Sequence, residues 1–167
     1  MSKSLSNYPQ EGKPLADLPV LDAHVHVGGM AGWDPPPLED QVREMDRLGI
    51  DCAVASASLA LSGVIKRGNN EVIEAMEQFP GVILGYCHVS GNYPDMIEEE
   101  LNRCFGHEGF VGIKIYPVGC PYDSDRFAPA WEFARRHSVP VLAHTWGGDM
   151  DDLQNAVAAN PDIPYMA

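Results

Sequence analysis

Apolar, strand-like runs recur along this sequence about every thirty residues, and this repeat limits the folds open to the chain. The runs begin near residues 20, 50, 82, 110, 139 and 163. Between them, apolar residues recur every three or four positions, as on one face of an amphipathic helix. Continuous apolar strands that alternate with such helices predict a parallel sheet covered on both faces.

The pattern predicts the approximate bounds of each element. The strands are expected at residues 20–27, 50–57, 82–89, 110–116, 139–144 and 163–167. The helices are expected at residues 37–48, 70–79, 93–105, 127–137 and 150–160. Residues 1–19 contain three prolines and are expected to form an irregular lead-in over the surface of one domain, residues 20–167.

Two α/β architectures fit this alternation, an open doubly wound sheet and a (β/α)8 TIM-type barrel. No GxGxxG motif follows the first strand, which weakens the dinucleotide-binding form of the doubly wound fold. A complete barrel takes roughly 250 residues. The 167 residues supply about five βα units and the start of a sixth strand, so the expected fold is an incomplete barrel.

The charge balance excludes some partners. The chain has 24 acidic and 11 basic residues, a net charge of −13, which repels nucleic acids and anionic membrane surfaces. The first residues have no apolar core like that of a signal peptide, and no run approaches the roughly 18 apolar residues of a membrane span. We therefore expect a cytoplasmic protein that acts on a small molecule.

A histidine pair occupies the end of the first predicted strand. Because side chains alternate along a strand, Asp22, His24 and His26 are expected to point to one face. Two imidazoles on one face can bind one metal ion. The alternative is a pair of ordinary core or surface histidines.

Other polar side chains follow the later strands, where the active sites of barrels lie. His88 ends the third strand, Lys114 and Tyr116 end the fourth, and His144 ends the fifth. As a third nitrogen donor, His144 would complete a site for a catalytic divalent ion, with zinc as the expected metal and one position left for water. Such an ion lowers the pKa of bound water to about 7.

The roles of three of these groups stay open. Lys114 is an ammonium in an apolar strand, so it is expected to be carboxylated and bridge two metals, to orient an anionic substrate, or to be merely structural. His88 is either a substrate contact or a satisfied strand-end histidine. Trp33 and Trp146, and also Tyr116, are candidates to line the substrate pocket, although the tryptophans could equally be loop packing.

The order Asp22-Ala-His24-Val-His26, Gly112-Ile-Lys114 and Pro140-Val-Leu-Ala-His144 resembles the amidohydrolase superfamily, especially its amidohydrolase-related branch. That branch includes metal-dependent hydrolases and lactonases, and decarboxylases such as aminocarboxymuconate-semialdehyde decarboxylase. The resemblance implies a distorted barrel with the metal held by His24, His26 and His144, and Lys114 at the position of a lysine that some members carboxylate. The family also uses a histidine after strand 6 and an aspartate after strand 8. Both would lie beyond Ala167, which implies a chain truncated at its carboxyl end.

The first functional expectation is a hydrolase in which metal-activated water attacks an ester, lactone or amide carbonyl. One alternative is a metal-dependent, non-oxidative decarboxylase that uses the same site. Another is a non-catalytic partial barrel that needs a partner chain. Because an incomplete barrel leaves two sheet edges unpaired, we also expect self-association or a homo-oligomer.

Overall fold

The structure is a computed structural model that describes residues 14, 18–145 and 150–167. Within these ranges, six parallel strands form one sheet whose spatial order follows the sequence, β1-β2-β3-β4-β5-β6. Every predicted strand is present, with its ends shifted by at most two residues. The strands are β1 (Leu21–Val27), β2 (Cys52–Ala57), β3 (Ile83–Val89), β4 (Phe110–Ile115), β5 (Val141–Ala143) and β6 (Tyr165–Met166).

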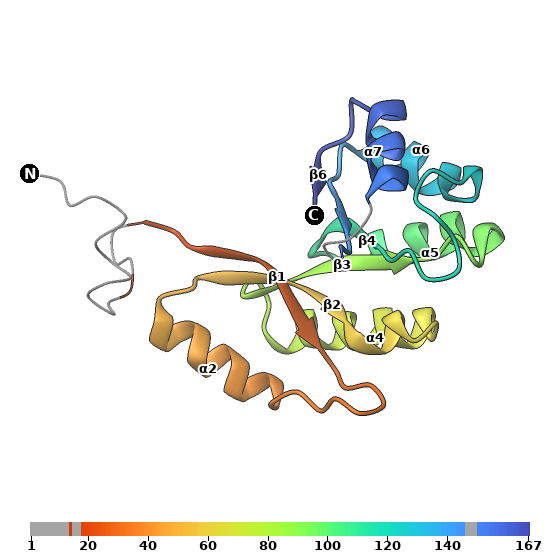
Figure 1. Cartoon of the computed structure of the whole chain (residues 1–167). Helices are drawn as coiled ribbons and strands as arrows, with labels where there is room; N and C mark the ends of the chain where they lie inside the picture. Colours follow the sequence, from red (N-terminus) through yellow and green to blue (C-terminus); the bar gives the residue numbers. More distant parts are fainter. Residues whose placement is uncertain (1–13, 15–17, 146–149) are drawn as a thin grey trace, which may run out of the picture.

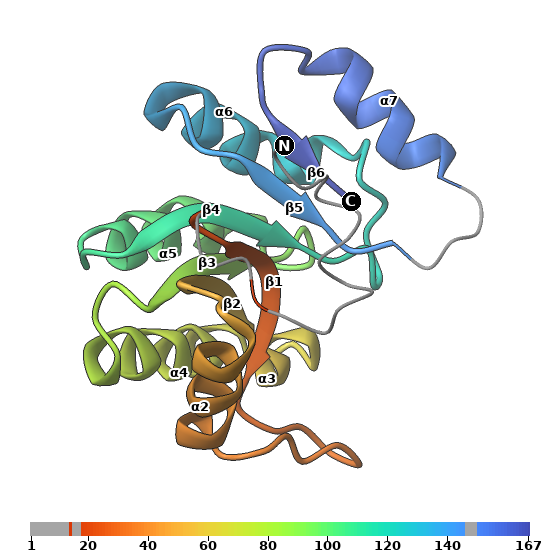
Figure 2. The ribbon, with the colours of Figure 1, turned by 90° about the vertical axis from the view of Figure 1, so that its left-hand side faces the viewer.

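The order of the strands distinguishes between the two predicted architectures. A doubly wound sheet reverses direction at a switch point, whereas here each strand lies beside the next one in the chain. Right-handed crossovers then place the helices along a single face of the sheet, not on both faces as the sequence pattern led us to expect. Figures 1 and 2 show the sheet curling, with the helices around its outside. The prediction of an incomplete (β/α)8 barrel is confirmed.

The helices differ more from prediction than the strands do. The longer ones are α2 (Leu38–Leu48), α4 (Ile65–Gln78), α5 (Pro94–Phe105), α6 (Ala128–His137) and α7 (Asp151–Ala159). The sequence pattern missed the short α3 (Ser58–Leu61) and the 3-10 turn η2 (Asp125–Phe127), and it started α4 five residues late. Gly68 allows the first turn of α4 to lie directly against Ala60 of α3, since a Cβ at Gly68 would come within 2.7 Å of the Ala60 nitrogen. Helix contacts, rather than local periodicity, therefore set the start of α4.

The inner face of the curled sheet carries a small apolar cluster. Its buried members Val54, Tyr86 and Leu142 come from β2, β3 and β5. The Tyr86 hydroxyl donates a 3.0 Å hydrogen bond to the carbonyl oxygen of Ala23 on β1. This bond passes over β2 to join two strands that are not neighbours, as the curvature of a barrel requires.

A bulge in β1 changes which residues share a face. Asp22 is in register with Ala53, but Val25 is in register with Ala55, so β1 carries one extra residue between them. Ala53 packs in the outer, helix-facing core, and its partner Asp22 lies on that face too. The prediction that Asp22 shares a face with both histidines is therefore wrong, because alternation does not continue through a bulge.

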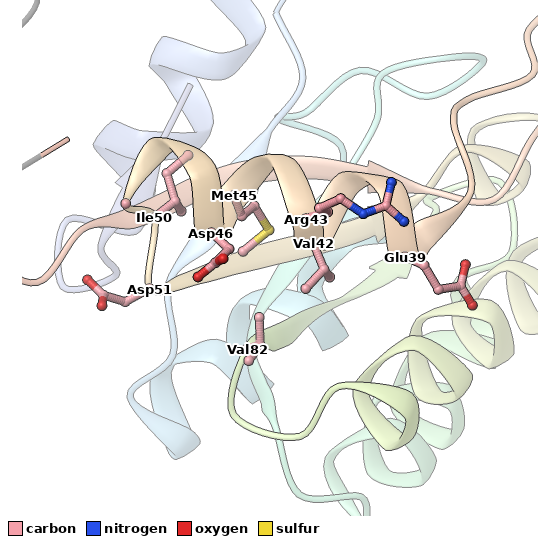
Figure 3. A pocket seen from close by; sticks show the side chains of 9 residues that line it. Glu39, Val42, Arg43, Met45, Asp46, Ile50, Asp51 and Val82 are labelled. Carbon is pink, nitrogen blue, oxygen red and sulfur yellow. The ribbon is translucent and has the colours of Figure 1, made fainter. Parts of the chain in front are cut away.

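A hollow of about 500 Å³ lies beside α2 and is drawn in Figure 3. Val42 and Met45 of α2 lie on one side of it, and Val82, which precedes β3, lies on the other. Asp51 and Val82 both precede strands, so the hollow is at the amino-terminal end of the sheet. In barrels this end serves stability rather than chemistry.

Membrane insertion through a helix finds no support in the described residues. No helix among them is both long enough and apolar enough to cross a bilayer.

Candidate metal centre

Polar side chains from four neighbouring strands meet at the carboxyl end of the inner face. His26 on β1 is in register with Ser56 on β2, and His88 on β3 is in register with Lys114 on β4. The Ser56 hydroxyl lies 3.4 Å from the Nδ1 atom of His26. Three of these four residues were predicted. Ser56 was not, because a serine in an alanine-rich strand gives no signal of its own.

His24 and His26 form the predicted pair at the centre of this site. Their ring centroids are 4.9 Å apart, and the Nζ atom of Lys114 is 3.4 Å from the Nε2 atom of His24. Burial, followed by the charge of Lys114, lowers the pKa of His24 to about 4 and also lowers the pKa of His26. Both imidazoles are therefore neutral at pH 7, which is the form that binds metals.

His144 follows β5 and lies between two segments. Its backbone N–H donates to the carbonyl oxygen of Ile115 at 3.1 Å, and its ring centroid is 4.7 Å from that of Tyr116. Burial lowers the pKa of His144, with smaller contributions from Lys114 and His26. The charge of Lys114 thus contributes to the lowered pKa of all three predicted imidazoles.

The chemistry of these donors fits a divalent ion. Three neutral imidazoles at the carboxyl ends of barrel strands are a ligand set that zinc and related metals accept. Among the described residues, however, no three His, Cys, Asp or Glu side chains are already close enough together to hold an ion. The paired rings of His24 and His26 are the preformed part of the site, and His144 would have to adjust to join them.

Lys114 is fully buried in this site. Burial lowers its pKa to about 8, so the amine is still mostly protonated at pH 7. Within the described part of the chain, His24 is its one hydrogen-bond partner, and no carboxylate forms an ion pair with it. A buried cation without a counter-charge is costly. An anion bound beside Lys114 would offset this cost.

His88 is held by a residue that the sequence did not single out. Asn69 of α4 is fully buried; its Oδ1 atom accepts from the backbone N–H of His88 at 2.9 Å, and its Nδ2 atom donates to the His88 carbonyl at 3.0 Å. The pairing of β2 with β3 ends at Gly85, so the side-chain amide takes the place of β2 beside His88. An asparagine in a helix pattern carries no signal of this role.

Burial also affects the titration of His88, which is 2% exposed. Desolvation, then Lys114 and His26, lower its pKa to about 3, so the ring is neutral in the fold. Its Nδ1 atom has no hydrogen-bond partner among the described residues. A buried nitrogen without a partner at this position could accept a hydrogen bond from a ligand.

The low pKa of His88 leads to an expected dependence of stability on pH. The unfolded chain takes up this proton near pH 6.5 and the fold near pH 3, so the free energy of unfolding decreases as the pH falls through that window. We expect His88→Asn to flatten this part of the curve, because asparagine does not titrate. Urea unfolding midpoints of the metal-free protein at pH 7, 6 and 5 measure it. If stability depended on pH in the same way in the wild type and in His88→Asn, the low pKa of His88 in the fold would be contradicted.

The predicted aromatic residues are placed differently from one another. Trp33 is 43% exposed, and its ring lies edge-on to that of His26 at 6.2 Å. Tyr116 lies just after β4 and packs against His144. Both can border a ligand at this end of the sheet. Trp146 lies outside the described residues.

Known proteins match this chain in sequence and in fold. The model of the family described as "Amidohydrolase" matches residues 21–166. Among curated proteins, the chain is 25% identical over 122 residues to gamma-resorcylate decarboxylase of Polaromonas sp.. That match covers 62% of this chain and 37% of the decarboxylase, so the chain spans well under half of this relative's length.

Solved structures share the fold at low identity. A 5-carboxyvanillate decarboxylase from Novosphingobium aromaticivorans, in complex with manganese and 4-hydroxy-3-methoxy-5-nitrobenzoic acid, has a TM-score of 0.67 and 17% identity. The match covers 79% of this chain and 52% of that one. For a 2,6-dihydroxybenzoate decarboxylase from Rhizobium the values are 0.66 and 16%, over 88% and 65% of the two chains. The chain thus spans half to two thirds of these structures.

Proposed function

Since this chain belongs to the amidohydrolase family, we propose that its strand-end site serves the metal-dependent, non-oxidative decarboxylation of a small aromatic acid. The observation that carries the proposal is the buried, protonated Lys114, which has no carboxylate partner among the described residues and lies 3.4 Å from a histidine of the predicted metal site. The similarity to decarboxylases in both sequence and structure supports this reaction over hydrolysis.

The proposed metal ligands are His24, His26 and His144. When bound, a divalent ion, manganese or zinc, would supply a Lewis acid that polarises an oxygen of the substrate. Manganese is included because the related 5-carboxyvanillate decarboxylase contains it. The histidines contribute neutral nitrogen donors, since burial keeps their pKa values low.

Lys114 is proposed to bind the anionic substrate and to hold a proton. Its ammonium is buried, and charge interactions with an acid are stronger where water is excluded. Decarboxylation breaks the bond to the carboxylate carbon and leaves the electron pair on the ring carbon, which then takes up a proton as CO2 departs. A pKa of about 8 suits Lys114 to hold such a proton near neutral pH.

His88 is proposed to contact the substrate as a neutral ring. Because its pKa is about 3, the ring is neutral at pH 7 and carries a single N–H. Its Nδ1 atom, which has no partner among the residues that the structure describes, can accept a hydrogen bond from a hydroxyl group. A hydroxybenzoate provides both the hydroxyl for His88 and the anionic oxygen for Lys114.

The proposal is tested by CO2 release from a panel of hydroxybenzoates, with Mn²⁺ or Zn²⁺ added, by the wild-type protein and by Lys114→Met. We expect turnover by the wild type and a loss of kcat/KM on the order of 100-fold in the variant, the scale for removing one preorganised charged donor. We also expect an equal or higher Tm for Lys114→Met, because an apolar side chain replaces a buried charge.

Lys66→Met is the matched control, because Lys66 is an exposed lysine on α4 and its loss should leave turnover unchanged. Ester or lactone cleavage without CO2 release would move the function to hydrolysis. Metal binding without any turnover would favour a non-catalytic partial barrel. Full activity of Lys114→Met would refute the role given to this lysine.

A further inference from the structure

The main chain of His144 is held from both sides at the end of a very short strand. β5 has only three residues, Val141–Ala143, so strand pairing alone does little to fix the residue that follows it. The N–H of His144 reaches the Ile115 carbonyl at 3.1 Å, and its carbonyl accepts a hydrogen bond from the Tyr122 hydroxyl at 2.5 Å. Tyr122 comes from the connection between β4 and η2, and not from a neighbouring strand.

Tyr122 is itself fixed to a third segment. Its backbone N–H donates to the Oδ2 atom of Asp152, on the first turn of α7, at 2.9 Å. Next to it, Asp123 accepts from the side-chain amide of Asn155 at 3.0 Å, which adds a second link to α7. The ring is buried, with its centroid 6.3 Å from that of Phe127. Because both the ring and the main chain of Tyr122 are fixed by these contacts, the position of its hydroxyl is fixed too.

The electrostatics keep this hydroxyl a donor. Burial raises the pKa of Tyr122, and the nearby carboxylate of Asp152 raises it further. The phenol therefore keeps its proton over the working range of pH. A protonated, buried hydroxyl with a fixed ring is a rigid anchor for the carbonyl that it contacts.

We propose that Tyr122 is a positioning residue for the metal site, which fixes the main chain of His144 so that its imidazole can join His24 and His26, and that Asp152 holds Tyr122 in place. The inference rests on the proposed function, because it requires His144 to be a ligand. Removing a group that hydrogen-bonds to a metal ligand and orients it typically lowers metal affinity by roughly 10- to 100-fold. Sequence patterns gave no reason to assign this role to either residue.

The test compares Mn²⁺ and Co²⁺ dissociation constants of the wild-type protein and of Tyr122→Phe, which loses only the hydroxyl. We expect the constants to rise about 10-fold or more, and the visible ligand-field spectrum of the Co²⁺ form to change. Tyr93→Phe is the control, because Tyr93 is exposed and outside the site. Titrations well below the Tm of each variant separate affinity from stability.

Asp152 provides the second variant pair. Asp152→Asn keeps an oxygen that can accept from the Tyr122 N–H and should bind metal nearly as the wild type does, whereas Asp152→Ala should weaken binding in the direction of Tyr122→Phe. A lower Tm with unchanged affinity and an unchanged Co²⁺ spectrum would show a purely structural role and overturn the inference. A wild-type protein that binds neither metal would overturn the proposed function, and the inference with it.

Discussion

Replacing His144 with alanine is expected to remove most of the bound divalent metal. The remaining donors, His24 and His26, would form a two-coordinate site, and catalytic metal sites ordinarily use three protein ligands. The loss of metal affinity should exceed the roughly 10- to 100-fold effect of removing a residue that only hydrogen-bonds to a metal ligand. Metal content after dialysis, measured by elemental mass spectrometry, and titration with Mn²⁺ or Zn²⁺ measure this loss.

His137→Ala is the matched control for this experiment. His137 lies at the end of α6, is exposed and stacks on Phe133 at a centroid distance of 4.1 Å, away from the strand ends that carry the site. It should retain the full metal content. Equal retention by both variants would remove His144 from the ligand set.

Replacing Asn69 with alanine is expected to lower the free energy of unfolding by about 3 kcal/mol or more. The N–H and the carbonyl of His88 would both lose their partner in the core, and each buried unpaired group costs about 1–3 kcal/mol. Glu100 would also lose a 2.9 Å bond from the asparagine amide and would keep its ion pair with Arg103. Since domains are stable by only about 5–15 kcal/mol, the expected loss is large.

Urea or thermal unfolding of Asn69→Ala and Asn70→Ala measures this effect. Asn70 is the next residue of α4 and is exposed, so its change to alanine should be neutral or slightly stabilising through higher helix propensity. The two variants share the same chemical change, and only the burial differs. A difference below about 1 kcal/mol would mean that water or a relaxed main chain replaces the amide.

The strands were predictable because each depends on a local run of apolar residues. Val82–Val89 was expected as a strand, and β3 spans Ile83–Val89. The helix faces were nearly as clear, but α4 began at Ile65 because Gly68 packs against Ala60, which is a contact between two elements. The bulge in β1 likewise depends on its pairing with β2, so alternation misplaced Asp22.

The residues of the candidate site also divide into those that the sequence predicted and those that it did not. His24, His26, Lys114 and His144 stood out because polar side chains at the ends of apolar strands are unusual, and a parallel barrel gathers such ends. That they act together on a metal and a substrate is still a proposal. The groups that support them could not be recognised in the sequence, since Ser56, Asn69 and Tyr122 acquire their roles through partners 19 to 30 residues away.

The sequence by itself determined the strand–helix repeat and the histidine pair on β1, because these depend on local hydrophobic pattern and on spacing within one element. The order of the strands in the sheet came from the tertiary structure. Only the tertiary structure decided which backbone groups Asn69 and Tyr122 hold and how deeply Lys114 is buried. The physical reason is that hydrogen bonding and desolvation depend on distances between segments that are far apart in the chain, and only the packed fold sets those distances.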